Sequence, residues 1–125
     1  MNAQAAMKSY SAVRTDASAQ AATPHQLIQM LFDGALERIA QAKGAMQQKN
    51  ITLKGEKISS AINIVGGLKD NLDLETGGEV AENLASLYDY IQRRLMEAHS
   101  KNDPMILDEA AALIIEVSDA WKQIG

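Results

Sequence analysis

Apolar residues recur along four stretches of the chain with alternating steps of three and four residues. This spacing is typical of helices that bury one side against nearly parallel or antiparallel neighbours. The stretches span about 24–48, 50–72, 79–99 and 104–124. Their repeating apolar positions are, in chain order, Ile28, Phe32, Ala35, Ile39, Ala42 and Met46; Ile51, Ile58, Ala61, Val65, Leu68 and Leu72; Val80, Leu84, Leu87, Tyr88, Ile91, Leu95 and Ala98; and Ile106, Ala110, Leu113, Ile114, Val117, Trp121 and Ile124.

Residues that favour helix starts stand at the head of three of these stretches. Thr23 can accept hydrogen bonds from free backbone N–H groups, Pro24 needs no donor at the first helical position, and Gln26 completes a capping box. Thr76–Glu79 repeats the capping-box pattern and predicts the start of the third helix after a linker. Asp103–Pro104 predicts the start of the fourth helix.

Two features interrupt the second apolar stretch. Lys54 falls among its apolar positions near the start, and the pair Gly66–Gly67 lies inside it. Glycine inside a helix costs about 1 kcal/mol relative to alanine, so the pair indicates a close neighbouring backbone or a bend. A docking groove is the less favoured interpretation. No phosphate-loop pattern surrounds the glycines, which argues against nucleotide binding there.

Four amphipathic helices joined by short turns predict an all-α fold, an antiparallel up-down-up-down four-helix bundle over residues 23–125. The 125 residues are enough for one domain with a core of its own. The chain has no cysteine, which excludes disulfides and thiolate metal sites.

Residues 1–22 differ from the rest, because they are mostly Ala, Ser, Gln and Thr without a sustained period. Only Met7, Tyr10 and Val13 are large and apolar, and on a helix they would share one side. A helix this short is marginal in water, so it would be ordered only by docking onto the bundle. Two interpretations stay open: a disordered tail, or a mobile arm that can form a helical cap and whose Tyr10 plugs an apolar site.

Composition and charge exclude several classes of function. Twelve basic against sixteen acidic residues give a net charge of −4, which argues against nucleic-acid binding. No apolar run reaches the length of about 18 residues typical of a membrane helix. The N-terminus lacks the hydrophobic stretch of a secretory signal peptide. We therefore expect a soluble helical protein of the cytoplasm, without membrane insertion.

The residues that could carry catalysis or bind a metal lack the necessary partners. His25 is expected to be an exposed first-turn residue, and His99 to complement the end of the third helix dipole. Glu97 lies two residues before His99, which is the wrong spacing for the Glu-x-x-His pairs of di-iron bundles. Asp33 and Glu37 lie one turn apart and are best explained as a solvated face. We predict no enzyme activity, no metal and no cofactor.

The helices carry more apolar residues than one stripe each requires. An exposed apolar groove would mark a binding site for an amphipathic helix, whereas wider burial would hide the same residues in the core. The pattern alone slightly favours wider burial. The surplus residues are Leu27, Met30, Leu31 and Leu36; Ile62 and Ile64; Tyr90 and Met96; and Leu107, Ala111 and Ile115.

Several motifs spread over the chain resemble the FliS family of flagellar export chaperones. They are Tyr10, the run Ala22–Leu36 with its pattern Thr-Pro-His-x-Leu-Ile-x-Met-Leu-x-Asp-Gly-Ala, the run Leu87–Leu95, and Ala120–Trp121. The resemblance spans essentially the whole chain. Phe32 departs from it, because a tyrosine is common there; the change removes a hydroxyl and keeps the packing role.

The resemblance implies a helical bundle that binds the C-terminal segment of flagellin, prevents its early assembly and hands it to the flagellar type III export machinery. It also implies an N-terminal segment that covers part of the apolar surface until flagellin displaces it. We expect a monomer or weak homodimer, with other flagellar export or regulatory proteins as further partners. An adaptor for another secreted subunit or a regulator is the alternative. The predicted contact residues are Met7, Tyr10, Ile62, Ile64, Tyr90 and Ile115.

Overall fold

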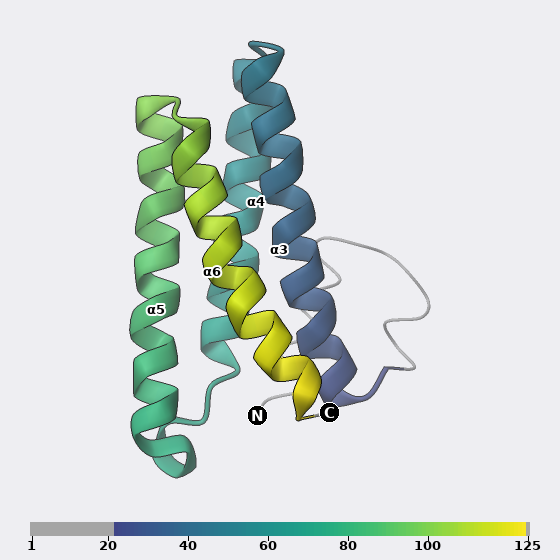
Figure 1. Ribbon diagram of the computed structural model, residues 1–125, viewed down its shortest axis with the longest axis vertical. Helices are drawn as coiled ribbons and strands as arrows, with labels where there is room; N and C mark the ends of the chain where they lie inside the picture. Colours follow the sequence, from purple (N-terminus) through teal and green to yellow (C-terminus); the bar gives the residue numbers. More distant parts are fainter. Residues whose placement is uncertain (1–21, 125) are drawn as a thin grey trace.

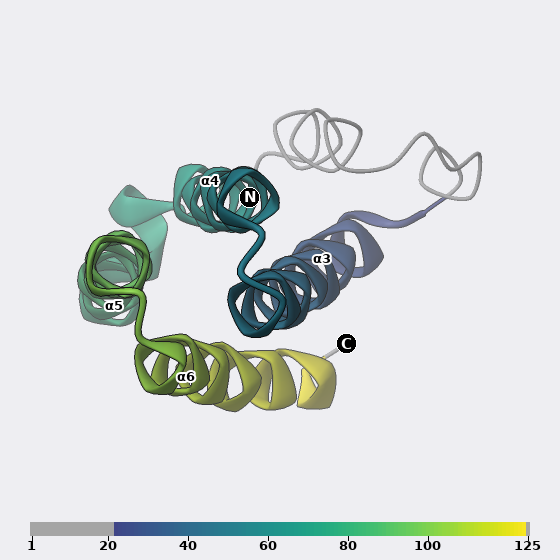
Figure 2. The same ribbon diagram turned by 90° about the horizontal axis from the view of Figure 1, so that it is seen from above.

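The computed structural model describes residues 22–124, which form four α-helices and no strand. The helices are α3 (Pro24–Gln47), α4 (Ile51–Asp70), α5 (Leu74–Lys101) and α6 (Pro104–Gln123). The prediction of an all-α fold is confirmed. In Figure 1 successive helices run in alternating directions. Helix α3 packs against α4 and α6, and α5 packs against the same two helices, so the four surround one core (Figure 2).

The predicted start of α3 is confirmed in atomic detail. The Thr23 Oγ1 atom accepts a hydrogen bond from the Gln26 backbone N at 3.1 Å. In return, the Thr23 backbone N donates to Gln26 Oε1 at 2.9 Å, with Pro24 in the first turn. The start of α6 is confirmed as well, because the Asp103 side chain accepts from the Met105 backbone N at 2.9 Å. Both helix starts therefore follow from short-range chemistry.

The predicted capping box at Thr76 is wrong, although the uninterrupted part of α5 begins after Gly78, close to the expected start near residue 79. Asp73, not Thr76, is the N-cap, and its Oδ1 atom accepts from the backbone N atoms of Glu75 and Thr76, each at 3.1 Å. The helix therefore begins at Leu74 and runs through the stretch expected to be a linker. It is broken once, at Gly78, whose φ of 55° and ψ of −135° are not helical. A non-glycine residue adopts such a conformation only with strain.

The core contains the predicted stripes together with much of the surplus apolar surface. Ile64, Leu27 and Leu107 join it from outside the predicted stripes, so wider burial accounts for part of the excess. Three stripe positions were assigned wrongly, because Ile51, Val80 and Ile124 at helix ends are 74%, 70% and 71% exposed. The buried core residues are Leu27, Ile28, Leu31, Phe32, Ala35, Ile39, Ala42, Met46, Ile58, Ala61, Ile64, Val65, Leu68, Tyr88, Ile91, Leu95, Ala98, Ile106, Leu107, Ala110 and Ile114.

The glycine pair in α4 lies where α5 approaches closely, although the neighbour is a side chain rather than a backbone. The Gln92 Nε2 atom of α5 donates to the backbone carbonyl of Ile62 at 3.0 Å. A Cβ atom at Gly66 would come within 3.3 Å of this nitrogen. Glycine at this position therefore gives the Gln92 amide access to the α4 backbone, and the bond joins the two helices.

Candidate functional site

A cavity of about 300 Å³ opens at the end of the bundle where the chain passes from α4 to α5, the lower end in Figure 1. All four helices and the α4–α5 connection contribute to its walls, and most of the lining residues are apolar. Such a pocket can accept large apolar side chains of a partner. Its lining residues are Ile28, Phe32, Leu68, Asn71, Leu72, Asp73, Thr76, Gly77, Val80, Ala81, Leu84, Tyr88, Val117 and Trp121.

The early start of α5 and its break at Gly78 supply one wall of this end pocket. Thr76 and Gly77 precede the break, whereas Val80 and Leu84 follow it, and all four residues line the cavity. Val80 is 70% exposed, so its isopropyl group stands at the rim instead of filling the interior. The beginning of α5 thus borders an open apolar space, and the expected core contact of Val80 is missing.

Two polar side chains face this pocket from buried positions. Asn71 is 6% exposed, and its Nδ2 atom donates to the Gly67 carbonyl at 2.7 Å. Its Oδ1 atom is buried and has no hydrogen-bond partner within residues 22–124. Burial raises the pKa of the Tyr88 phenol to about 12, so this side chain stays uncharged at neutral pH. The pocket is therefore mostly apolar, and Asn71, one of its lining residues, has a buried carboxamide oxygen without a partner in the described part of the chain.

His25 and Trp121 join the first turn of α3 to the last turn of α6 beside the pocket. The Trp121 Nε1 atom donates to the His25 carbonyl at 3.0 Å, and His25 Nε2 lies 2.9 Å from the Trp121 carbonyl. The two rings stack with centroids 4.6 Å apart and planes inclined by 7°. His25 is therefore partly buried and engaged, and the expectation of an exposed side chain is wrong. This contact fixes the indole at the pocket wall.

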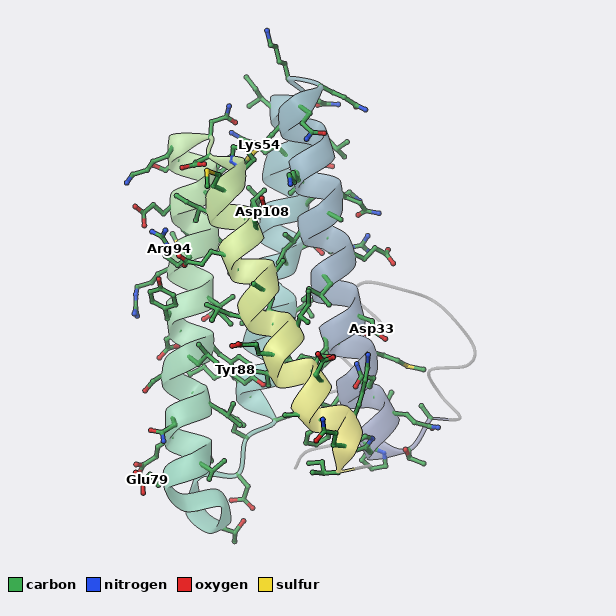
Figure 3. The ribbon with its side chains drawn as sticks, in the orientation of Figure 1. Asp33, Lys54, Glu79, Tyr88, Arg94 and Asp108 are labelled. Carbon is green, nitrogen blue, oxygen red and sulfur yellow. The ribbon has the colours of Figure 1, made fainter. Side chains whose placement is uncertain are left out.

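A polar network occupies the outer seam between α5 and α6. The Glu109 Oε1 atom accepts from the Tyr90 hydroxyl and from Arg94 Nε, each at 2.9 Å. Arg94, labelled in Figure 3, also pairs with Glu97, and Glu97 pairs in turn with Lys101 at 2.6 Å. The hydrogen bonds from Arg94 and then from Tyr90 hold the pKa of Glu109 below its ordinary value of 4.5. The bond to Glu109 raises the pKa of the Tyr90 phenol.

Because this network contains Glu109, we expect the stability of the protein to depend on pH in the acid range. The pKa of Glu109 is lower in the folded state than its ordinary value of 4.5. The ionised carboxylate therefore stabilises the fold above that value, and this stabilisation is lost as the pH falls through the folded-state pKa. Glu109→Gln is therefore expected to lower the urea midpoint at neutral pH, with the difference from the parent protein shrinking in acid. Glu116→Gln, which alters an exposed carboxylate on the same helix, is the control. Equal effects of the two changes at neutral pH would contradict the prediction.

The predicted partner contacts within residues 22–124 do not line the end pocket. Met7 and Tyr10 fall outside the described residues. Ile64 is 2% exposed and belongs to the core, so an external partner cannot reach it in this arrangement. Ile62 is partly buried against the core, and Tyr90 belongs to the α5–α6 network. Ile115 is 46% exposed on α6; like Ile62, Ile64 and Tyr90, it does not line the pocket.

Most apolar residues of the pocket were missed because the sequence pattern assigned them to the core. Val80, Leu84 and Trp121 fit helical stripes, whereas no role was predicted for Asn71. The available signal was the Gly77–Gly78 pair at the head of a stripe, which indicates a break close to apolar residues. Placing the wall of a pocket there would have required knowing that α5 begins before the break.

The described residues offer little basis for other chemistry. Among residues 22–124 no cluster of three His, Asp or Glu side chains is placed to hold a metal ion. Within the same range no helix combines the length and apolar character needed to cross a membrane. Asp33 is exposed, and its Oδ1 atom accepts from Gln29 Nε2 at 3.1 Å.

Comparisons with known proteins agree with a binding role. The family model described as "Flagellar protein FliS" matches residues 6–125. The "Flagellar secretion chaperone FliSB" of Pseudomonas aeruginosa is 50% identical, over 100% of this chain and 99% of its own length. The "Flagellar secretion chaperone FliS" of Salmonella typhimurium is 45% identical over 95% of this chain and 89% of its own length, and that of Vibrio cholerae is 43% identical over 94% and 87%. These relatives are named as chaperones and not as enzymes. The chain belongs to the FliS family of flagellar secretion chaperones.

Proposed function

We propose that this protein binds the C-terminal segment of flagellin in the cytoplasm, prevents premature polymerisation and supports delivery to the flagellar type III export apparatus. Membership of the family supports the role, and the end pocket supports the mode of binding. The observation that carries the proposal is an open apolar cavity of about 300 Å³ with walls from all four helices. An amphipathic helical segment can place its apolar side chains in such a cavity.

The energetics make the pocket an anchor rather than the whole binding surface. Burial of one large apolar side chain contributes about 1.5–3 kcal/mol. Micromolar affinity requires about 8 kcal/mol, and ordering a flexible segment costs several kcal/mol more. The client must therefore bury further apolar surface beyond the pocket. We propose that the exposed side chain of Ile115 and the outer edges of Ile62 and Tyr90 serve this purpose, as the sequence predicted.

The N-terminal arm is proposed to compete with flagellin for the end pocket. Tyr10 carries an aromatic ring suited to apolar walls and a hydroxyl that can donate to the unsatisfied Asn71 Oδ1 atom. Met7 lies three residues before it in the sequence, so on a helix it would share the same side and add apolar contact. An arm that occupies the pocket weakens the apparent binding of flagellin. The apparent dissociation constant equals the intrinsic constant divided by the fraction of molecules whose pocket is open. The arm would then keep the apolar surface covered until a client arrives.

Tyr10→Phe tests the competition directly, because it retains the ring and removes only the hydroxyl. Losing one hydrogen bond to a buried acceptor is expected to loosen the arm and raise flagellin affinity about three- to tenfold. Calorimetric titration of the full chain with a flagellin C-terminal peptide measures the change. In an Asn71→Ala background the same substitution is expected to have no further effect, because the acceptor is gone. Equal affinities of the parent and Tyr10→Phe proteins would contradict this role of the hydroxyl.

A second titration separates the flagellin proposal from the proposal about the arm. Flagellin lacking its C-terminal segment should not bind, whatever residue occupies position 10. Retained binding of the truncated flagellin would contradict the choice of client and favour the adaptor interpretation. Binding of intact flagellin that is lost on truncation, with no response to Tyr10→Phe, would preserve the client and reject the competing hydroxyl.

A further inference from the structure

A second cavity, of about 430 Å³, lies at the opposite end of the bundle from the end pocket. It forms where α3 ends, α4 begins and α5 ends. Three of its lining residues, Ala45, Met46 and Ile51, are apolar, and the other three are Lys49, Lys54 and Asn102. None of the six carries a carboxylate. We call this cavity the lysine pocket.

Lys54 is a buried cation that has no carboxylate partner in the described part of the chain. The residue is 6% exposed, close to the upper end of the bundle in Figure 3. Its Nζ atom donates to Asn102 Oδ1 at 3.0 Å and to the His99 carbonyl at 3.3 Å. Within residues 22–124 no carboxylate lies within ion-pair distance of Lys54 or Lys49. An ammonium group has three donors, so one N–H of Lys54 is left for a ligand.

The helix ends around the lysine pocket compensate only part of its charge. Lys54 Nζ is bonded to the His99 carbonyl near the C-terminus of α5, where the helix dipole places a partial negative charge. This partial charge, equivalent to about half an elementary charge, is smaller than the full charge of the ammonium. The positive charges of Lys49 and Lys54 are left without an acidic counterpart in the lining. A cation with incomplete compensation beside apolar walls is complementary to a carboxylate that carries an apolar chain.

We propose that the lysine pocket binds a carboxylate on a short apolar chain, with Lys54 Nζ donating to the carboxylate and with Met46 and Ile51 packing against the chain. Such a group can come from the C-terminal end of a polypeptide or from a free carboxylic acid. The site lies at the other end of the molecule from the proposed flagellin anchor. The proposal of a carboxylate site can therefore be tested independently of the flagellin proposal.

Titration of the ¹⁵N-labelled full chain with hexanoate, followed by amide shifts in two-dimensional NMR, tests the proposal. Saturable shifts are expected at the backbone amides around Ile51, Lys54 and Asn102. Hexan-1-ol has the same chain without the charge and should bind at least about tenfold more weakly. No saturable shifts with hexanoate, or equal binding of the alcohol, would overturn the proposal.

Variants identify the donor. Lys54→Met keeps an apolar stem and removes the ammonium, so hexanoate binding should weaken about tenfold or more. Lys101→Met removes an ammonium that pairs with Glu97 on α5 and does not line the pocket, so it is the matched control and should leave hexanoate binding within about twofold. Unchanged binding by a folded Lys54→Met protein would show that Lys54 only caps α5, and would overturn the proposal, as would an equal loss of binding in Lys101→Met.

A pair of peptides distinguishes the two sources of the carboxylate. An acetylated pentapeptide that ends in leucine is compared with the same peptide carrying a C-terminal amide. Binding of the acid form at least as tightly as hexanoate assigns the pocket to the end of a polypeptide. Binding of hexanoate alone assigns it to a free acid. Equal binding of the peptide acid and the peptide amide would contradict a carboxylate site.

Discussion

Val80→Glu is expected to weaken binding of the flagellin C-terminal segment by at least about tenfold. The change places a carboxylate at the rim of the end pocket, where an apolar client side chain would cover it. Covering an unpaired charge costs more free energy than the 1.4 kcal/mol that corresponds to a factor of ten. Val80 is 70% exposed, so the free protein should keep its stability. Calorimetric titration measures the affinity, and urea unfolding checks the fold.

Met105→Glu is the matched control for this substitution. Met105 is 76% exposed at the start of α6 and lines neither pocket. The same charge at this position should leave the affinity within about twofold, because surface charges far from the contact are screened by salt. Equal losses in both variants would show a general charge effect. Undiminished binding by Val80→Glu would exclude the end pocket as the anchor.

Leu95→Ala is expected to lower the free energy of unfolding by about 2–5 kcal/mol. Leu95 is 0% exposed and lies in the core segment of α5, outside the end pocket. Removing its isobutyl group leaves a cavity that surrounding helices can close only in part. A loss of this size is a large share of the stability of a small domain. Urea unfolding with a helix signal measures it.

The neighbouring residue gives a control on the same helix. Met96 is 62% exposed, and Met96→Ala should change the free energy of unfolding by no more than about 0.5 kcal/mol. A loss from Met96→Ala as large as that from Leu95→Ala would contradict the assigned orientation of α5. Flagellin affinity corrected for the fraction folded should be unchanged in Leu95→Ala, since this side chain does not reach the client.

The parts of the fold that local chemistry decides could be predicted from the sequence. The capping box at Thr23 and the Asp103–Pro104 start use residues within three positions of each other. The apolar stripes of α3 and of most of α6 lie in the core because their period matches a helix facing its neighbours. Such signals do not depend on which helix packs beside which.

The errors arise where two local signals compete or where a helix runs past its neighbours. Asp73 and Thr76 both precede sequences that allow a helix start, and the periodic pattern does not show which of them wins. Ile51, Val80 and Ile124 continue a stripe in sequence but lie at helix ends, where no opposite helix covers them. The end pocket follows from this mismatch of helix ends, which is a property of packing and not of any one segment.

Polar contacts between residues far apart in the sequence could not be predicted either. His25 and Trp121 are 96 positions apart, and only the fold shows that each bonds the backbone of the other. In the sequence Lys54 interrupts an apolar stripe. In the structure it is buried, and its ammonium group is hydrogen-bonded to the end of α5. In both cases the residue type was noticed, but its partner lies on another helix.

The backbone conformation at Gly78 has a consequence for the entrance of the end pocket. One achiral residue sets the direction in which Leu74–Gly77 leaves the helix axis, and this segment borders the mouth of the cavity. A β-carbon at position 78 would strain this main-chain angle, so a substitution there is expected to shift Thr76 and Gly77 and with them one side of the entrance.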